Sequence, residues 1–178
     1  KNFDIPYYYE GWDNIKIKYS EGAESSYGWS RDWADSMRTF DQENPHHTLS
    51  LGAHCIATDK ALDQLCKDAP EPLAYKVSFD LIHATLLHDC GKPSCKTFTN
   101  SKGEMTEVAH YYNHERTGSY NSLFYNTYDD NLYRAALIRW HMQPYYWEKD
   151  NNEKLHNKYR KLWGEDLYKE IMLLDTCD

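Results

Sequence analysis

The sequence has little of several features that would assign it to a common class of protein. Only two of its 178 residues are valine, against 16 leucines, and this bias favours helix over β-sheet. No apolar run approaches the roughly 18 residues that a membrane span needs, and no signal-peptide core opens the chain. The five cysteines include no CxxC pair, which argues against a disulfide framework and a cysteine-based zinc site. We therefore expect a helical protein of a reducing, cytoplasmic compartment.

Positively charged residues are also fewer than negatively charged ones. Lysine and arginine number 20 against 28 aspartates and glutamates, a formal net charge of −8. This balance argues against a protein that binds along nucleic-acid duplexes, and it leaves a small phosphorylated substrate or a single nucleic-acid end as the partner to consider. Aliphatic residues are few, but 16 tyrosines and 6 tryptophans supply the apolar area that a core needs. The length fits one domain with an aromatic-rich interior.

The hydrophobic pattern divides the chain into two parts. Residues 1–29 are predicted to form an irregular, tyrosine-rich N-terminal arm, with a short strand or hairpin near 15–19. Residues 30–178 are predicted to form an all-α bundle, in which Ser30 caps the first helix and Gly91 ends the third. We expect helices at 31–42, 48–66, 74–89, 107–125, 131–141, 151–163 and 165–178, with a polar loop at 93–106 and a break at 143–147. Because the chain lacks an initial Met and stops within an apolar pattern, we expect a fragment truncated at its C-terminus.

Histidine is abundant, and several of the 9 histidines stand beside apolar neighbours on separate predicted helices. An imidazole or carboxylate buried there is costly unless it is hydrogen-bonded or bound to a metal. Helices that each turn such a ligand inward are typical of a metal site in a bundle core, and imidazoles with carboxylates suit cations such as Mn, Fe, Co, Ni or Zn. The candidate ligands are His54, His88, Asp89, His114, His141 and a final aspartate, Asp178 or Asp175.

Three local motifs carry these candidates in a defined order. Leu86–Pro93 has the sequence LLHDCGKP, His110–Glu115 has HYYNHE, and Leu137–His141 has LIRWH. Together with His54 and the final aspartate, this series resembles the HD-domain superfamily of metal-dependent phosphohydrolases. The HDxGKP form is similar to that of HD domains related to those of tRNA nucleotidyltransferases. The resemblance covers residues 44–178, and it implies the helical bundle of an HD domain.

The resemblance also implies how the ligands divide. His54, His88, Asp89 and the last aspartate would bind one divalent ion, which can also be Mg. Asp89 would bridge to a second ion, for which the ligands would be His114 and His141. Asp178 is favoured as the last ligand because it follows the small residue Cys177, and Asp175 is the alternative one helical turn earlier.

The resemblance implies catalysis as well. Lys92, three residues after the His-Asp pair, would meet the substrate phosphate as a compact positive charge. Asp89, Lys92 and His114 are the implied catalytic residues, and Lys92 is the implied substrate contact. His110, one turn before His114, and Arg139, beside a ligand residue, are further candidates for substrate binding because of their positions. The implied reaction is hydrolysis of a phosphomonoester or phosphodiester, on a nucleotide or a nucleic-acid terminus, by a metal-bound hydroxide.

Two other functions fit the same ligand set. The six ligands could hold two irons that activate dioxygen, as in the myo-inositol oxygenase branch of the superfamily. The chain could also be a non-catalytic HD-like module of a larger protein, in which metals only brace the bundle. The intact Lys92 beside a complete ligand set argues for catalysis.

Several other polar and aromatic residues have an ordinary structural interpretation. His83 and His156 are expected to be hydrogen-bonded core residues, and Cys90 and Cys95 small packed thiols. His46 and His47 are expected to cap the second helix rather than line a pocket mouth. Arg116 and Arg139 are expected in ion pairs. The remaining candidates can be core or a base-stacking surface, namely Tyr111, Tyr112, Tyr145, Tyr146 and Trp147.

Overall fold

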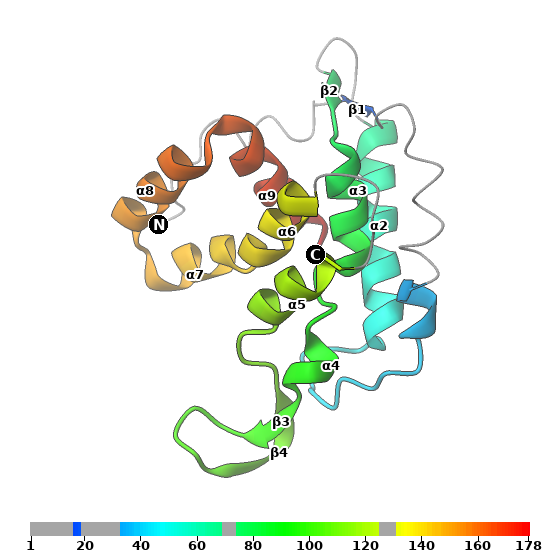
Figure 1. Ribbon diagram of the computed structural model, residues 1–178, viewed down its shortest axis with the longest axis vertical. Coiled ribbons are helices and arrows are strands. Elements are labelled where there is room, and N and C mark those ends of the chain that lie inside the picture. Colours follow the sequence, from blue (N-terminus) through cyan, green and yellow to red (C-terminus); the bar gives the residue numbers. More distant parts are fainter. Residues whose placement is uncertain (1–15, 19–32, 69–73, 125–130) are drawn as a thin grey trace.

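The computed structural model describes residues 16–18, 33–68, 74–124 and 131–178. Figure 1 shows a mainly helical molecule with two small two-stranded sheets, so the predicted helical class is confirmed. The predicted Ser30 cap and most of the N-terminal arm lie outside the described residues. None of the described helices is long and apolar enough to cross a membrane.

The helices differ widely in length. They are α2 (Leu51–Asp68), α3 (Phe79–Leu87), α4 (Lys92–Cys95), α5 (His114–Ser122), α6 (Asn131–Trp140), α7 (Gln143–Asp150), α8 (Glu153–Trp163) and α9 (Glu165–Cys177). Helix α3 lies between α2 on one side and α6 and α9 on the other, and α5 lies along α6 (Figure 1). The predicted helices at 131–141, 151–163 and 165–178 correspond closely to α6, α8 and α9.

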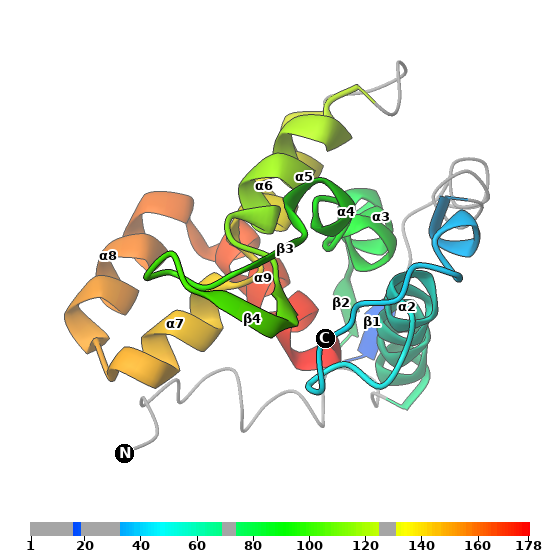
Figure 2. The ribbon, with the colours of Figure 1, turned by 90° about the horizontal axis from the view of Figure 1, so that it is seen from below.

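The strands form two separate pairs. β1 (Lys16–Lys18) pairs in parallel with β2 (Ala74–Lys76), and β3 (Thr97–Thr99) pairs antiparallel with β4 (Met105–His110). The strand predicted near 15–19 is therefore present. The β3–β4 hairpin projects from one end of the helical body, and Figure 2, seen from that end, shows it in front of the helices.

Five of the predicted boundaries are wrong. Residues 74–76 form a strand, and α3 starts only after Ser78, whose hydroxyl accepts a hydrogen bond from the Leu81 amide as an N-cap. The predicted loop at 93–106 contains α4, β3 and the start of β4, and β4 occupies residues that were assigned to the helix at 107–125. The predicted break at 143–147 is helix α7, because Pro144 stands in the first turn, where its missing N–H is not needed. The helix predicted at 31–42 is helical only over residues 33–36 of its described part.

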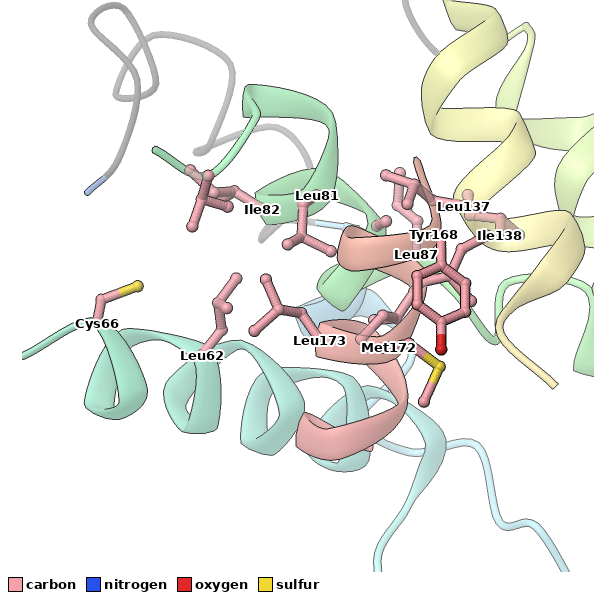
Figure 3. Packing of buried hydrophobic residues seen from close by; sticks show 14 of the residues in the cluster. Leu62, Cys66, Leu81, Ile82, Leu87, Leu137, Ile138, Tyr168, Met172 and Leu173 are labelled. Carbon is pink, nitrogen blue, oxygen red and sulfur yellow. The ribbon is translucent and has the colours of Figure 1, made fainter. Parts of the chain in front are cut away.

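The main hydrophobic core lies where α2, α3, α6 and α9 meet. Figure 3 shows Leu62 of α2, Leu81 of α3 and Leu173 of α9 pointing toward one another in this core, and all three are fully buried. A second part of the core is aromatic. The ring centroids of Trp147 on α7 and Trp163 on α8 lie 5.5 Å apart, and Trp163 packs against the buried cluster that includes Trp147. The expected aromatic-rich interior is present.

A buried carboxylate ties the last helix to the third. Glu170 of α9 accepts hydrogen bonds from the backbone N–H of Ser78 at 2.7 Å and from its hydroxyl at 2.6 Å. Burial raises the pKa of Glu170, and the hydrogen bonds from Ser78 oppose that rise. Since His88 ends α3 and Asp178 follows α9, this contact also sets the distance between two candidate ligands.

We expect Glu170→Ala to lower the free energy of unfolding by about 2 kcal/mol, because both Ser78 donors then lose a charged acceptor in a buried place. Urea denaturation followed by circular dichroism measures this change. Glu165→Ala is the matched control: Glu165 lies on the same helix as Glu170, and the change removes an exposed ion pair with Arg160 of α8, which should cost less than about 1 kcal/mol. Equal losses for the two variants would contradict the assigned role of Glu170.

Candidate metal centre

The candidate ligands all stand at or near the ends of helices. His54 lies in the first turn of α2, His88 caps the C-terminus of α3 and Asp89 follows it. His114 opens α5, and the two remaining candidates follow α6 and α9 directly, as His141 and Asp178. Because helix ends can converge where helix middles would collide, one small volume receives side chains from five helices.

The first group consists of His54, His88 and Asp178. The Nε2 atoms of the two histidines lie 3.2 Å apart. Asp178 Oδ1 lies 2.8 Å from Nε2 of His54 and 3.1 Å from Nε2 of His88. Ligand atoms bound to one ion at about 2.1 Å stand roughly 3.0–3.4 Å apart in octahedral or tetrahedral geometry. These three side chains could therefore hold one metal ion.

The second group consists of Asp89, His114 and His141, all of them buried. Asp89 Oδ1 lies 3.2 Å from Nε2 of His114 and 3.8 Å from Nε2 of His141. The two Nε2 atoms lie 3.4 Å apart. This set could hold a second ion.

Asp89 connects the two groups through its two carboxylate oxygens. Its Oδ1 faces the second group, whereas its Oδ2 lies 3.5 Å from Nε2 of both His54 and His88. A carboxylate in this position can bridge two ions.

Three of the imidazoles are oriented in the same way. Nδ1 of His88, His114 and His141 lies 3.0, 2.8 and 2.7 Å from the carbonyl oxygen three residues earlier. A carbonyl oxygen only accepts, so each Nδ1 carries the hydrogen and each neutral ring turns the lone pair of Nε2 inward. In the second group, two such lone pairs and a carboxylate oxygen then face one another. This arrangement requires a shared cation or proton, and a backbone carbonyl behind a histidine is common at metal sites.

Burial and charge shift the pKa values of these groups in different directions. Burial opposes protonation of His88, but the carboxylates of Asp178 and Asp89 outweigh it and raise its pKa from 6.5 to about 9. Burial lowers the pKa of His141 to about 3. Burial tends to raise the pKa of Asp89 and Asp178, but the charge of His88 beside them lowers both below the usual range. Ionised carboxylates and a neutral His141 are the forms that bind a metal ion.

Lys92 lies beside the bridging carboxylate. Its Nζ is 2.6 Å from Asp89 Oδ2, and it donates a hydrogen bond of 2.9 Å to Oε1 of Gln42. Gln42 in turn donates from Nε2 to the carbonyl oxygen of Leu49 at 3.1 Å, and it is almost fully buried. Sequence reasoning did not single out Gln42, which lies outside the motifs and carries no local signal.

Gly91 matters for spacing rather than for ending a helix. Its φ of −81° is open to any residue, so the expected helix stop is not its role. A Cβ on Gly91 would lie 2.1 Å from the carbonyl oxygen of His114 and 2.6 Å from the amide of Gly118. The glycine thus lets α5 approach the His-Asp turn closely enough for His114 to reach Asp89.

A cleft of about 750 Å³ opens onto this centre. Its floor includes His54, Asp89, Lys92, His114 and Asp178, whereas His88 and His141 do not line it. Its walls come from residues 42–49, from residues 110–115 between β4 and α5, and from residues 142–146 at the start of α7.

The structure separates the remaining predicted site residues. His110 lines the cleft, and its Nε2 lies 3.1 Å from the hydroxyl oxygen of Thr106. Arg139 does not line the cleft; it stacks on Trp140 and lies 3.7 Å from Glu115, as its expected ion pair requires. Asp178 belongs to the first ligand group and Asp175 to neither. Burial raises the pKa of Asp175 to about 7.

Other predicted roles follow the same division. His156, as expected, is a core residue, with Nε2 2.9 Å from the Tyr168 hydroxyl. His83 and Cys90 are buried. His46 and His47 line the cleft, so the preferred capping role is wrong, because α2 begins only at Leu51.

No protein-family model, curated protein or solved structure matches the chain. The resemblance to HD domains therefore remains a prediction, which its three motifs and the arrangement of the candidate ligands support.

We expect the protein to bind two divalent cations per chain, one in each ligand group. After loading with Mn²⁺ and desalting, elemental analysis should find two ions in the wild type and one in His141→Ala, which removes a ligand of the second group only. His110→Ala, a histidine of the same cleft outside both groups, is the control and should keep two. Two ions in His141→Ala, or none in the wild type, would refute the assignment.

We expect Mn²⁺ binding at pH 7.5 to release about one proton. With a pKa of about 9, His88 is protonated at this pH until a cation takes its Nε2 lone pair. The apparent affinity should then rise about tenfold per pH unit from pH 6.5 to 8.5. Calorimetric titration in two buffers of different ionisation enthalpy measures the released proton, and a proton count near zero would contradict the shifted pKa.

Proposed function

We propose that the chain is an HD-type metal-dependent phosphohydrolase, which hydrolyses a phosphate ester of a nucleotide or of a nucleic-acid terminus. The observation that carries the proposal is the position of the Asp89 carboxylate, with one oxygen toward His114 and His141 and the other toward His54 and His88. Bound there, two divalent cations lower the pKa of water and neutralise the charge of a phosphate during in-line attack.

The burial of the ligands supports a reaction at the cleft side of the centre. His88 and His141 are sealed in the interior, whereas Asp178 keeps 26% of its side chain exposed and His54 keeps 17%. Asp89 and His114 also border the cleft. A phosphate that enters the cleft therefore meets one open face of the ligand set, and the other face is closed by the core.

Lys92 supports phosphate chemistry in particular. Lys92 lines the cleft, although only 4% of its surface is exposed. Asp89 and Gln42 accept two of the three ammonium hydrogens, which leaves the third for a phosphate oxygen. In this position Lys92 orients the ester and offsets negative charge as the ester bond breaks. A module that used metal only as a brace would not require a lysine beside the bridging carboxylate, open to a cleft.

We expect the protein to release phosphate or a phosphomonoester from aryl phosphate mono- or diesters in the presence of Mn, Fe, Co, Ni, Zn or Mg. Asp89→Asn should remove activity, and Lys92→Met should lower kcat/KM about 10²–10³-fold, because one charged donor at the reacting phosphate is lost. Lys67→Met is the control, since Lys67 is exposed and pairs with Asp63 on α2 outside the cleft lining.

Three results would reject this proposal. If Lys92→Met leaves the activity unchanged, the reaction does not take place at the assigned site. A protein with two irons that consumes oxygen and releases no phosphate would be an oxygenase. Metals that only raise the melting temperature, with no turnover of any ester, would make the chain a structural module.

A further inference from the structure

The mouth of the cleft is lined by exposed aromatic rings. Tyr112 keeps 45% of its surface exposed, Tyr145 50% and Tyr146 42%. They come from two segments, the turn before α5 and the first turns of α7, and all line the same cleft as Asp89. Rings exposed at the mouth of a cleft, rather than packed in the core, provide a surface on which another flat group can stack.

One of these surfaces is already a flat platform. The rings of His110 and Tyr112 are stacked, with an interplanar angle of 12° and centroids 5.4 Å apart. The contact between His110 Nε2 and the Thr106 hydroxyl holds the His110 ring in place. Any nucleobase can stack on such a pair of rings, because every base has a π-face.

An amide stands next to this platform. Asn113, which also lines the cleft, has a φ of 61°, a left-handed conformation that asparagine tolerates better than most residues. Its side chain makes no capping hydrogen bond to α5, and it is exposed. Asn113 follows Tyr112 directly and lines the same cleft, so its amide, with both donors and an acceptor, can meet the edge of a base that stacks there.

The charge of the cleft limits how many phosphates it can hold. Among the described residues, Lys92 is the only lysine or arginine that lines the cleft, and Asp89 already pairs with it. The nearby Arg116 and Arg139 both lie 3.7 Å from Glu115, so they share its carboxylate. Within the described lining, lysine or arginine charge is therefore present only on the cleft floor. No second group of lysines or arginines in the described ranges lines the cleft where a β- or γ-phosphate would lie.

From these observations we infer that the cleft takes a nucleoside monophosphate unit, with its one phosphate on the floor and its base stacked on His110 and Tyr112 at the mouth. The inference rests on the proposed function for the phosphate end. A volume of about 750 Å³ is within the range of small-molecule sites. The unit can be a free nucleotide or the 5′-terminal nucleotide of a strand, since both present the same base and phosphate.

The base part of the inference is tested without added metal and without turnover. Adenosine binding, followed by saturation-transfer NMR and equilibrium dialysis, should be detectable for the wild type and about tenfold weaker for Tyr112→Ala. Tyr112→Phe should restore binding. Tyr120→Ala is the control, because Tyr120 is also exposed to solvent but lies on α5 outside the cleft lining, where its ring contacts that of Phe124. Adenosine that fails to bind, or binds Tyr112→Ala as well as the wild type, would overturn the inference.

The phosphate part is tested by hydrolysis in Mn²⁺. We expect kcat/KM for AMP to exceed that for ribose 5-phosphate and that for ATP, each by about tenfold or more, and Tyr112→Ala to remove most of the preference for AMP over ribose 5-phosphate. Equal values for AMP and ribose 5-phosphate, or for AMP and ATP, would overturn the inference and leave the proposed phosphohydrolase intact. If neither these compounds nor the aryl mono- and diesters are hydrolysed, the proposed function fails, and the adenosine binding measurement still decides the base site. A 5′-phosphorylated trinucleotide cleaved faster than AMP would assign the unit to a strand end.

Discussion

The structure depends on how the charge of the buried Asp89 carboxylate and the lone pairs of the imidazoles around it are balanced, because little water reaches them. Asp89 is buried, and four imidazole nitrogens lie between 3.2 and 3.8 Å from its two oxygens. The carbonyl oxygens behind three of the rings keep their protons on the far nitrogen, so the near nitrogens cannot all donate to the carboxylate. Positive charge from protons, Lys92 or metal ions has to balance this cluster. The pKa of His88, raised to about 9, is one expression of that requirement.

The ends of the helices carry the residues of this cluster, so the packing of the helices sets the distances within it. Gly91 leaves room for α5 to bring His114 toward Asp89, and Glu170 fastens α9 to the start of α3. These contacts lie outside the ligand set, yet they fix distances within it. The core of α2, α3, α6 and α9 supplies the rigidity, because close-packed interiors have little freedom to shift.

Much of the candidate site could be predicted because its residues are chemically conspicuous. Histidines and aspartates beside apolar residues on helices are costly without partners, so their convergence followed from the pattern and from the resemblance. The helical class and the late helices followed from periodicity. The boundaries near the site did not, because Ser78, Pro144 and the β3–β4 pairing act through capping and long-range contacts that compete with periodicity. Asp178 is preferred to Asp175 because it follows the small residue Cys177, and it is Asp178 that lies with His54 and His88. The role of Gln42, in contrast, depends on a contact across 50 residues.

The segment around Gln42 has a bearing on how much of the chain makes up the working unit. The carbonyl oxygen of Gln42 accepts a hydrogen bond from the Tyr111 hydroxyl, and that of Glu43 accepts one from the amide of Ala109. Lys96 donates to the carbonyl oxygen of Asp41. A shortened protein that starts at residue 44, where the resemblance begins, would retain every candidate metal ligand but would lack Gln42, which accepts a hydrogen bond from Lys92 and lines the cleft. The residue that steadies Lys92 thus lies in a different stretch of the polypeptide from the ligands, so a change before residue 44 can alter Lys92 without removing a ligand.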